Sequence, residues 1–155
     1  MGATTIGERC DGIKPDSTFE NPWINSFNHY SYGAIRDWIY RSMVGIDTYE
    51  DGVGYRHIKI EPLIGGDFTY ASASLETYYG KVSNGWKIDR DNLIMDTEIP
   101  ANTSATIFIP AKNAENIFEN GKIISASNDI KVLGTEENYV TINLGSGKYH
   151  FISKM

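Results

Sequence analysis

The residues of this sequence that could do chemistry gather near its N-terminus. Glu8, Arg9 and Asp11 form a short charged cluster in a segment that has no helix or strand pattern. Judged by residue type alone, Glu8 is expected to be a solvated loop carboxylate, because exposed Glu is the norm in proteins. His29 lies further along, in an apolar stripe, where a hydrogen-bonded and partly buried histidine is the usual finding. A neighbouring amide, Asn28, is expected to help cap a helix.

Other potential ligands and nucleophiles are scattered along the chain. The single cysteine, Cys10, has no neighbouring histidine and no metal-binding spacing, so we expect an unreactive thiol without a disulfide partner. His57 and His150 lie alone on predicted strands. The segments 65–66 and 145–147 are expected to be glycine turns, because no helix start follows them as a phosphate loop requires. We therefore expect neither a metal ion nor another cofactor.

Composition argues against two classes of partner. The chain has 155 residues and a formal net charge of -6, and it has no run of Lys and Arg, which disfavours nucleic acid. No apolar run approaches the roughly 20 residues of a membrane span. The first residues lack the basic start and apolar middle of a signal peptide, which leaves the cellular location open.

The sequence predicts a long loop over residues 1–24 and one helix, apolar on most sides, over residues 26–44. Its apolar positions form two adjacent rows, Phe27, Tyr30, Ala34 and Trp38, and then Ile35, Ile39 and Met43. Asn25 or Ser26 is expected to cap its start and Gly45 to end it. A stripe this broad must be covered by something large. One way to cover it is a homo-oligomer formed through this helix.

After a turn-rich linker the apolar period changes from helical to alternating. Strands are predicted at 56–61, 68–77, 80–89, 93–95, 105–109, 117–118, 123–124, 140–144 and 148–152. Turns are expected at 91–92, 119–121 and 145–147, and Asn84-Gly85 is a weaker candidate. We expect Trp38 and Trp86 to be core residues. Short strands at this spacing predict a mainly β fold, an antiparallel β-sandwich of jelly-roll type. The chain is thus expected to divide into residues 1–47 and a β-sandwich domain, 48–155.

Several of these stretches together resemble one enzyme family. They are Gly2 to Arg9, Asp11-Gly12, Asn25 to Tyr30, Gly33-Ala34, Trp38, Gly45 to Asp47 and Tyr70 to Ser74. They look like the C-terminal end of a bacterial α-L-rhamnosidase, and the match runs from residue 2 to about residue 110. The family has a catalytic (α/α)6 helical barrel followed by a C-terminal β-sandwich. The resemblance implies that the helix at 26–44 is the last barrel helix.

The resemblance also implies a reaction, the inverting hydrolysis of a terminal α-L-rhamnoside. Glu8 falls at the position of the family's general base, and His29, Arg9 and Asn28 fall at substrate-binding positions. The family's general acid lies upstream, outside this sequence. Gly7 and Cys10 stand where the family usually has tryptophans, which would cover the sugar and tune the carboxylate.

Two functions remain in competition. The first is a C-terminal fragment of an α-L-rhamnosidase, inactive alone, whose partner is a rhamnose-containing glycan or glycoside. The alternative is a non-catalytic β-sandwich that binds carbohydrate or serves in assembly. An aromatic share of 12% permits carbohydrate binding without demanding it.

Overall fold

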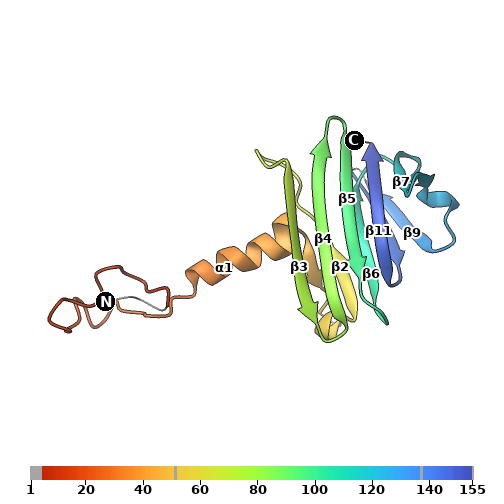
Figure 1. Cartoon of the computed structure of the whole chain (residues 1–155). Helices are drawn as coiled ribbons and strands as arrows, with labels where there is room; N and C mark the ends of the chain where they lie inside the picture. The colour runs from red at the N-terminus through yellow and green to blue at the C-terminus, as the bar shows by residue number, and fades with distance from the viewer. Residues whose placement is uncertain (1–4, 51, 137, 155) are drawn as a thin grey trace. The chain divides into compact units, whose positions relative to one another are not determined.

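The structure is a computed structural model that describes residues 5–50, 52–136 and 138–154. The chain divides into two compact units, with the boundary between Trp38 and Ile39. The first contains the charged loop and helix α1 (Ser31–Trp38), and the second contains two β-sheets (Figure 1). Within the described ranges, no helix is long and apolar enough to cross a membrane. The division expected at residue 47 stays a prediction about the family's domains.

The larger unit is a β-sandwich, as predicted. Its strands are β1 (Ile46–Thr48), β2 (His57–Ile60), β3 (Tyr70–Thr77), β4 (Gly80–Asp89), β5 (Asn92–Ile99), β6 (Ser104–Pro110), β7 (Ile117–Glu119), β8 (Lys122–Ile123), β9 (Ile130–Glu136), β10 (Tyr139–Leu144) and β11 (Gly147–Lys154). One sheet has the order β1-β2-β6-β10-β9 and the other β3-β4-β5-β11-β7-β8. Figure 1 shows the two sheets face to face.

The pairing is antiparallel except between β2 and β6, which run parallel. A parallel pair needs a long crossover, and here the chain builds β3, β4 and β5 of the opposite sheet before it returns as β6. The predicted turn at 145–147 also crosses between sheets, because β10 and β11 belong to different ones. The segment therefore closes one side of the sandwich and is not a hairpin turn.

Alternating side chains from both sheets build the core. Its largest fully buried members include Phe151, Ile58, Ile60, Leu93, Met95, Ile107, Ile109 and Ile142. Trp86 is 2% exposed, which confirms its prediction as a core residue. Burial of this much aliphatic surface is the main stabilising contribution to the sandwich.

Some predicted local structure is wrong. Asn84-Gly85 lies in the middle of β4, and the β4–β5 turn is Arg90-Asp91, one residue before the predicted turn. Strands β1 and β9 were not predicted. β1 is only three residues long, and most of β9 is exposed, so neither shows a clear apolar alternation. The turn at 119–121 is confirmed, with Asn120 and Gly121 both at positive φ.

The helix is shorter than the predicted range of 26–44. Helix α1 spans Ser31–Trp38, and a π-helical turn spans Ile39–Met43. Neither Asn25 nor Ser26 caps it, because residues 26–29 pair with an earlier segment of the loop. Helix α1 has no buried residue, and Trp38 is 47% exposed, which corrects its expected place in a core. Gly45 ends the helical stretch as predicted, at a φ of 83°.

Two side chains of β4 bind the backbone that ends this helical stretch. Trp86 donates its indole N–H to the carbonyl of Met43 at 2.8 Å, and Asn84 donates its amide to the carbonyl of Val44 at 2.7 Å. Asn84 also accepts a hydrogen bond from the Thr97 hydroxyl at 2.7 Å. The last carbonyls of a helix have no intrahelical partner, so these donors satisfy groups that would otherwise be buried without one.

Candidate functional site

The predicted site residues come from two backbone segments that lie side by side in the N-terminal unit. The amide of Glu8 donates to the carbonyl of Ser26 at 2.7 Å, and the amide of His29 donates to the carbonyl of Ile6 at 2.8 Å. The Thr5 hydroxyl donates to the carbonyl of Phe27. These bonds explain why residues 26–29 are not helical, since their backbone groups are paired with residues 5–8. They also bring Glu8 into the neighbourhood of Asn28 and His29.

A second contact fixes the loop around this pair of segments. A Cβ added to Gly12 would lie 2.7 Å from the Oδ1 atom of Asn25, so the absence of a side chain at Gly12 lets Asn25 approach. The loop then forms a small turn, in which the Asp16 carboxylate accepts two hydrogen bonds from Thr18, from its amide at 3.0 Å and from its hydroxyl at 2.6 Å. These bonds lower the pKa of Asp16. These polar contacts add to the packing of the Phe19 ring near that of Phe27, with the ring centroids 5.8 Å apart.

The Glu8 side chain is exposed and bends back toward segment 26–29, with which its own segment is paired. Its Oε2 atom accepts a hydrogen bond from the backbone N–H of Ser26 at 3.2 Å. A carboxylate held in this way is oriented while it stays accessible to water. It can accept a proton from a water molecule, which is the chemistry of a general base.

Arg9 is engaged by a carboxylate of its own loop. Its Nε atom donates to Asp11 Oδ1 at 2.9 Å and its Nη2 atom donates to Asp11 Oδ2 at 2.8 Å, a bidentate pair. The hydrogen bond with Arg9 lowers the pKa of Asp11, and the same bond raises the pKa of Arg9. Sequence reasoning placed the two residues in one cluster but missed that they pair. This pair holds the guanidinium in one orientation next to Glu8 in the chain.

The other predicted residues differ in their surroundings. His29 is half-buried, with its ring 5.5 Å from that of Tyr30, whereas Asn28 is exposed. A Cβ at Gly7 would meet nothing closer than 3.5 Å, so this position has room for a larger side chain. Cys10 is exposed and free. The structure thus places the four predicted site residues on two paired segments of one loop, with Glu8 and Arg9 on the first and Asn28 and His29 on the second.

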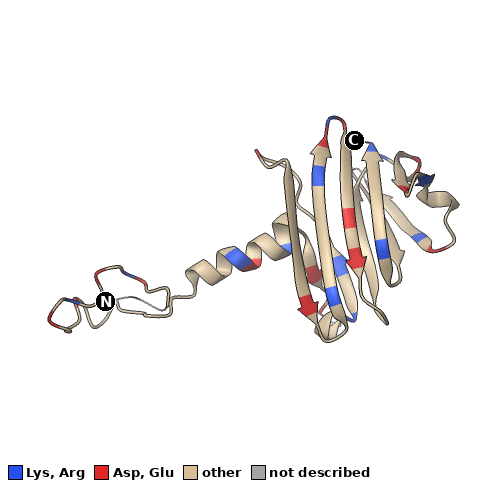
Figure 2. Ribbon diagram, viewed as in Figure 1, with Lys and Arg blue, Asp and Glu red and all other residues tan. Residues whose placement is uncertain are grey.

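Charged residues of both signs occur in both units. Figure 2 shows acidic and basic residues interspersed along the strands of the sandwich. In the sandwich, ion pairs join Lys148 and Lys81 to Glu98, at 3.3 and 3.7 Å. Among residues 5–50, 52–136 and 138–154 there is no group of three or more His, Cys, Asp or Glu side chains that could hold a metal ion.

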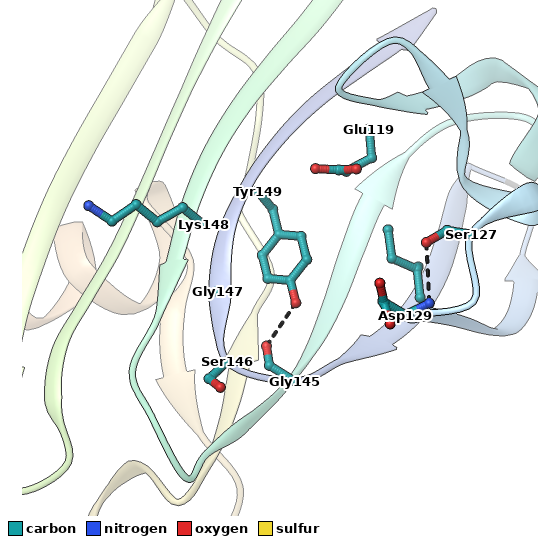
Figure 3. A pocket seen from close by; sticks show the side chains of 9 residues that line it. Glu119, Ser127, Asp129, Gly145, Ser146, Gly147, Lys148 and Tyr149 are labelled. Carbon is teal, nitrogen blue, oxygen red and sulfur yellow. Dashed lines mark hydrogen bonds between the residues drawn. The ribbon is translucent and has the colours of Figure 1, made fainter.

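Sequence reasoning missed one further feature, a hollow in the sandwich. It is lined by side chains from β7, β11 and the segment before β9, among them Glu119, Asp129 and Tyr149 (Figure 3). These residues are far apart in the sequence, and no motif connects them. Only the pairing of the strands shows that they surround a common space.

Two family models match the chain on either side of residue 44. Residues 1–43 match the bacterial alpha-L-rhamnosidase 6 hairpin glycosidase domain, and residues 45–123 match the bacterial alpha-L-rhamnosidase C-terminal domain. Among curated proteins, an alpha-L-rhamnosidase of Formosa agariphila is 35% identical over 154 residues, which is 99% of this chain and 16% of that protein. An alpha-L-rhamnosidase of Streptomyces avermitilis is 34% identical over 97% of this chain and 14% of its own length.

Solved structures give the same result. The Streptomyces avermitilis alpha-L-rhamnosidase complexed with L-rhamnose matches 98% of this chain with a TM-score of 0.74 and 32% identity. The alpha-L-rhamnosidase from Dictyoglumus thermophilum matches 99% of it with a TM-score of 0.75 and 30% identity. This chain spans 14% and 16% of those two structures. Both the sequence and the fold therefore place this chain in the family of bacterial α-L-rhamnosidases, at the end of the six-hairpin glycosidase domain and in the C-terminal domain that follows it.

Proposed function

We propose that this chain acts as the C-terminal part of an α-L-rhamnosidase, which releases a terminal α-L-rhamnose from a glycoside with inversion. Relatives that match nearly all of this chain are alpha-L-rhamnosidases, and the chain spans 14–16% of their length. In this proposal the chain supplies one side of a hydrolytic site that other segments of the barrel complete. By itself it is inactive.

The observation that carries the proposal is the position of Glu8. Its carboxylate is exposed to water, oriented by the Ser26 amide and held on the same segment pair as Asn28 and His29. An inverting glycosidase needs a carboxylate that activates water, about 6.5–9.5 Å from the carboxylic acid that protonates the leaving oxygen. Glu8 takes the first role here, and a residue from another part of the barrel supplies the acid.

The neighbouring residues then bind the sugar. Asn28 and His29 offer an amide and an imidazole to sugar hydroxyls. Arg9 follows Glu8 in the chain, and its guanidinium binds the substrate. Asp11 fixes the orientation of that guanidinium through two hydrogen bonds. Gly7 and Cys10 provide no aromatic cover, so the sugar face must be covered by side chains from other barrel segments.

The domain division belongs to the same proposal. Residues 1–47 form the closing part of the catalytic barrel, and residues 48–155 form the C-terminal domain. Helix α1 has no buried residue, although Tyr32 and Ile35 are both apolar and 58% exposed. The remaining barrel helices would cover this surface and recover the free energy of burying it.

The test is a Glu8→Gln substitution in a full-length α-L-rhamnosidase whose C-terminal part is this chain. Removal of a general base typically lowers the rate by about 10²–10⁴-fold, so kcat for an aryl α-L-rhamnoside should fall by that amount with little change in KM. Glu20→Gln is the matched control, because Glu20 lies in the same loop and pairs with Lys14 at 2.8 Å. The proton NMR spectrum of the first product formed should show the inverted anomer.

Two outcomes would contradict the proposal. An unchanged kcat in Glu8→Gln would remove Glu8 from the general-base role. Turnover by the 155-residue chain alone, abolished by Glu8→Gln, would show that the chain needs no other barrel segment.

A further inference from the structure

A hollow with a volume of about 440 Å³ opens at one end of the sandwich, where the chain crosses from β10 to β11. Its walls come from the end of β7, the segment leading into β9, the 145–147 crossover and the start of β11. Figure 3 shows the side chains around it. The volume lies within the range of sites that hold small molecules, about 300–1,000 Å³.

Ile130 and the Tyr149 ring supply the apolar part of the lining, which we call the floor of the hollow, and the ring is held in place. Ile130, one of the lining residues, is 6% exposed. The Tyr149 ring stacks on Phe151 with centroids 5.9 Å apart and planes 6° apart, and its hydroxyl donates to the carbonyl of Gly145 at 3.2 Å. A Cβ at Gly147 would lie 3.2 Å from the ring, so a glycine there lets the backbone pass close to it. The ring is thus fixed at its face and at its hydroxyl before any ligand arrives.

The rim of the hollow is rich in hydrogen-bonding oxygen atoms. Figure 3 shows the carboxylates of Glu119 and Asp129 directed toward the side that holds Tyr149. Burial raises the pKa of Tyr149, and the charges of Asp129 and Glu119 raise it further, which agrees with this proximity. Ser127 and Ser146 add hydroxyl groups to the lining.

The Asp129 carboxylate is available to a ligand. Its backbone amide donates to the Ser127 hydroxyl at 3.3 Å, but no donor or cation binds its carboxylate among the residues that the structure describes. Glu119 accepts one hydrogen bond, from the Asn120 amide to Oε1. Lys148 also lines the hollow, but its side chain turns away (Figure 3) and pairs with Glu98 at 3.3 Å.

From this arrangement we propose that the hollow is a non-catalytic sugar subsite, which binds one pyranose ring of a neutral glycan. The apolar C–H face of the ring lies on the Tyr149 floor, and its hydroxyls donate to the Asp129 and Glu119 carboxylates. Hydrogen bonds to ionised acceptors are the stronger ones, and an aromatic floor adds apolar contact. The subsite holds a sugar unit on the sandwich domain, separately from hydrolysis at Glu8.

The charges of the hollow decide against other ligands. Among the described residues that line the hollow, two are carboxylates and the one cation, Lys148, turns away, so an anionic ligand would be repelled. A calcium ion needs six to eight oxygen ligands, and no group of three or more candidate side chains exists within the described ranges. An organic cation would use the carboxylates and the ring, but it would leave the hydroxyls of Ser127 and Ser146 without a role.

The proposal does not rest on the hydrolytic function, so its test uses binding by the 155-residue chain. Methyl α-L-rhamnoside and methyl β-D-glucoside are titrated to tens of millimolar while backbone amide shifts are followed by NMR. We expect saturable shift changes at Ser127, Asp129 and 145–149 with at least one sugar. Asp129→Asn should weaken that binding by about ten-fold, because it removes one charged acceptor.

Matched controls separate this site from general effects. Asp89→Asn removes an exposed carboxylate at the end of β4, outside the hollow, and should leave affinity unchanged. Tyr149→Phe keeps the ring and should still bind, whereas Tyr149→Ala should bind poorly if it folds. Sorbitol, an open-chain polyol, should bind much more weakly than either pyranoside.

Three results would overturn the proposal. They are no shift changes with either sugar, shift changes confined to other parts of the chain, and unchanged affinity in Asp129→Asn. Shifts at the hollow with calcium chloride or tetramethylammonium but with neither sugar would show that it is a cation site instead. None of these results bears on the role of Glu8, which the rate measurement tests separately.

Discussion

The buried amide of Asn84 offers the sharpest test of how the sandwich holds the end of the helical stretch. Asn84 is 1% exposed and joins the Val44 carbonyl to the Thr97 hydroxyl through two hydrogen bonds of 2.7 Å. Asn84→Ala leaves both of these buried groups without their partner. Each unsatisfied group costs about 1–3 kcal/mol, so the two together should lower the free energy of unfolding by about 2–6 kcal/mol. This is a large share of the ordinary domain stability of about 5–15 kcal/mol.

An acidic variant makes the reasoning more specific. In Asn84→Asp, an ionised carboxylate would face the Val44 carbonyl, whereas a protonated one could donate to it. Burial should raise the pKa of this new carboxyl group above its unfolded value of about 3.9. Its stabilising form is then fully present below that unfolded value and is lost as pH rises through the folded pKa. Asn84→Asp should therefore be less stable than Asn84→Ala at neutral pH and should regain stability relative to it in acid.

The assay is urea unfolding of the 155-residue chain, followed by circular dichroism at several pH values. Asn128→Ala is the control, because Asn128 is exposed in a loop and its substitution should change stability by about 0.5 kcal/mol or less. The reasoning is refuted if Asn84→Ala loses no more stability than the control. It is also refuted if the stabilities of the two Asn84 variants change identically with pH.

Three further predictions concern the loop and the helical stretch. Gly45→Ala should lower the free energy of unfolding more than Gly54→Ala does. Both residues have positive φ, but only a Cβ at Gly45 would lie 2.3 Å from the backbone of Pro62. Urea unfolding should show a difference of at least about 1 kcal/mol between the two variants. Arg9→Gln should raise the pKa of Asp11 toward its ordinary value in an NMR titration. In the native chain, the stability that this carboxylate contributes is present above its unfolded pKa and is lost as pH falls through the lowered folded value. The exposed apolar residues of α1 should cause the isolated chain to self-associate, and a monomer at high concentration in light scattering would contradict this.

The sequence by itself determined the class of fold and the family. Alternating apolar residues and turn formers located most strands, because each strand of a sandwich buries one face and shows it as a period of two. Gly45 was predictable as the end of the helical stretch, since a left-handed residue there favours glycine. The short loop motif around Glu8 could also be identified from the sequence, because its residues are adjacent in the chain.

The tertiary structure decided what depends on partners distant in sequence. Asn84-Gly85 has the composition of a turn, but Asn84 is buried because its amide meets the carbonyl of Val44. Residues 26–29 have a helical pattern, but their backbone pairs with residues 5–8. Local propensity is worth only a fraction of a kcal/mol per residue, so several long-range hydrogen bonds outweigh it.

The hollow around Tyr149 is the clearest case of a feature that sequence reasoning could not find. Glu119, Asp129 and Tyr149 come from separate segments, and none of them belongs to a motif. They surround one space because the 145–147 crossover changes sheets and β11 then pairs with β7, with Phe151 opposite Glu119, so that Tyr149 lies just past the end of β7. Periodicity reports which face of a strand is buried, but the pairing of strands decides which faces meet.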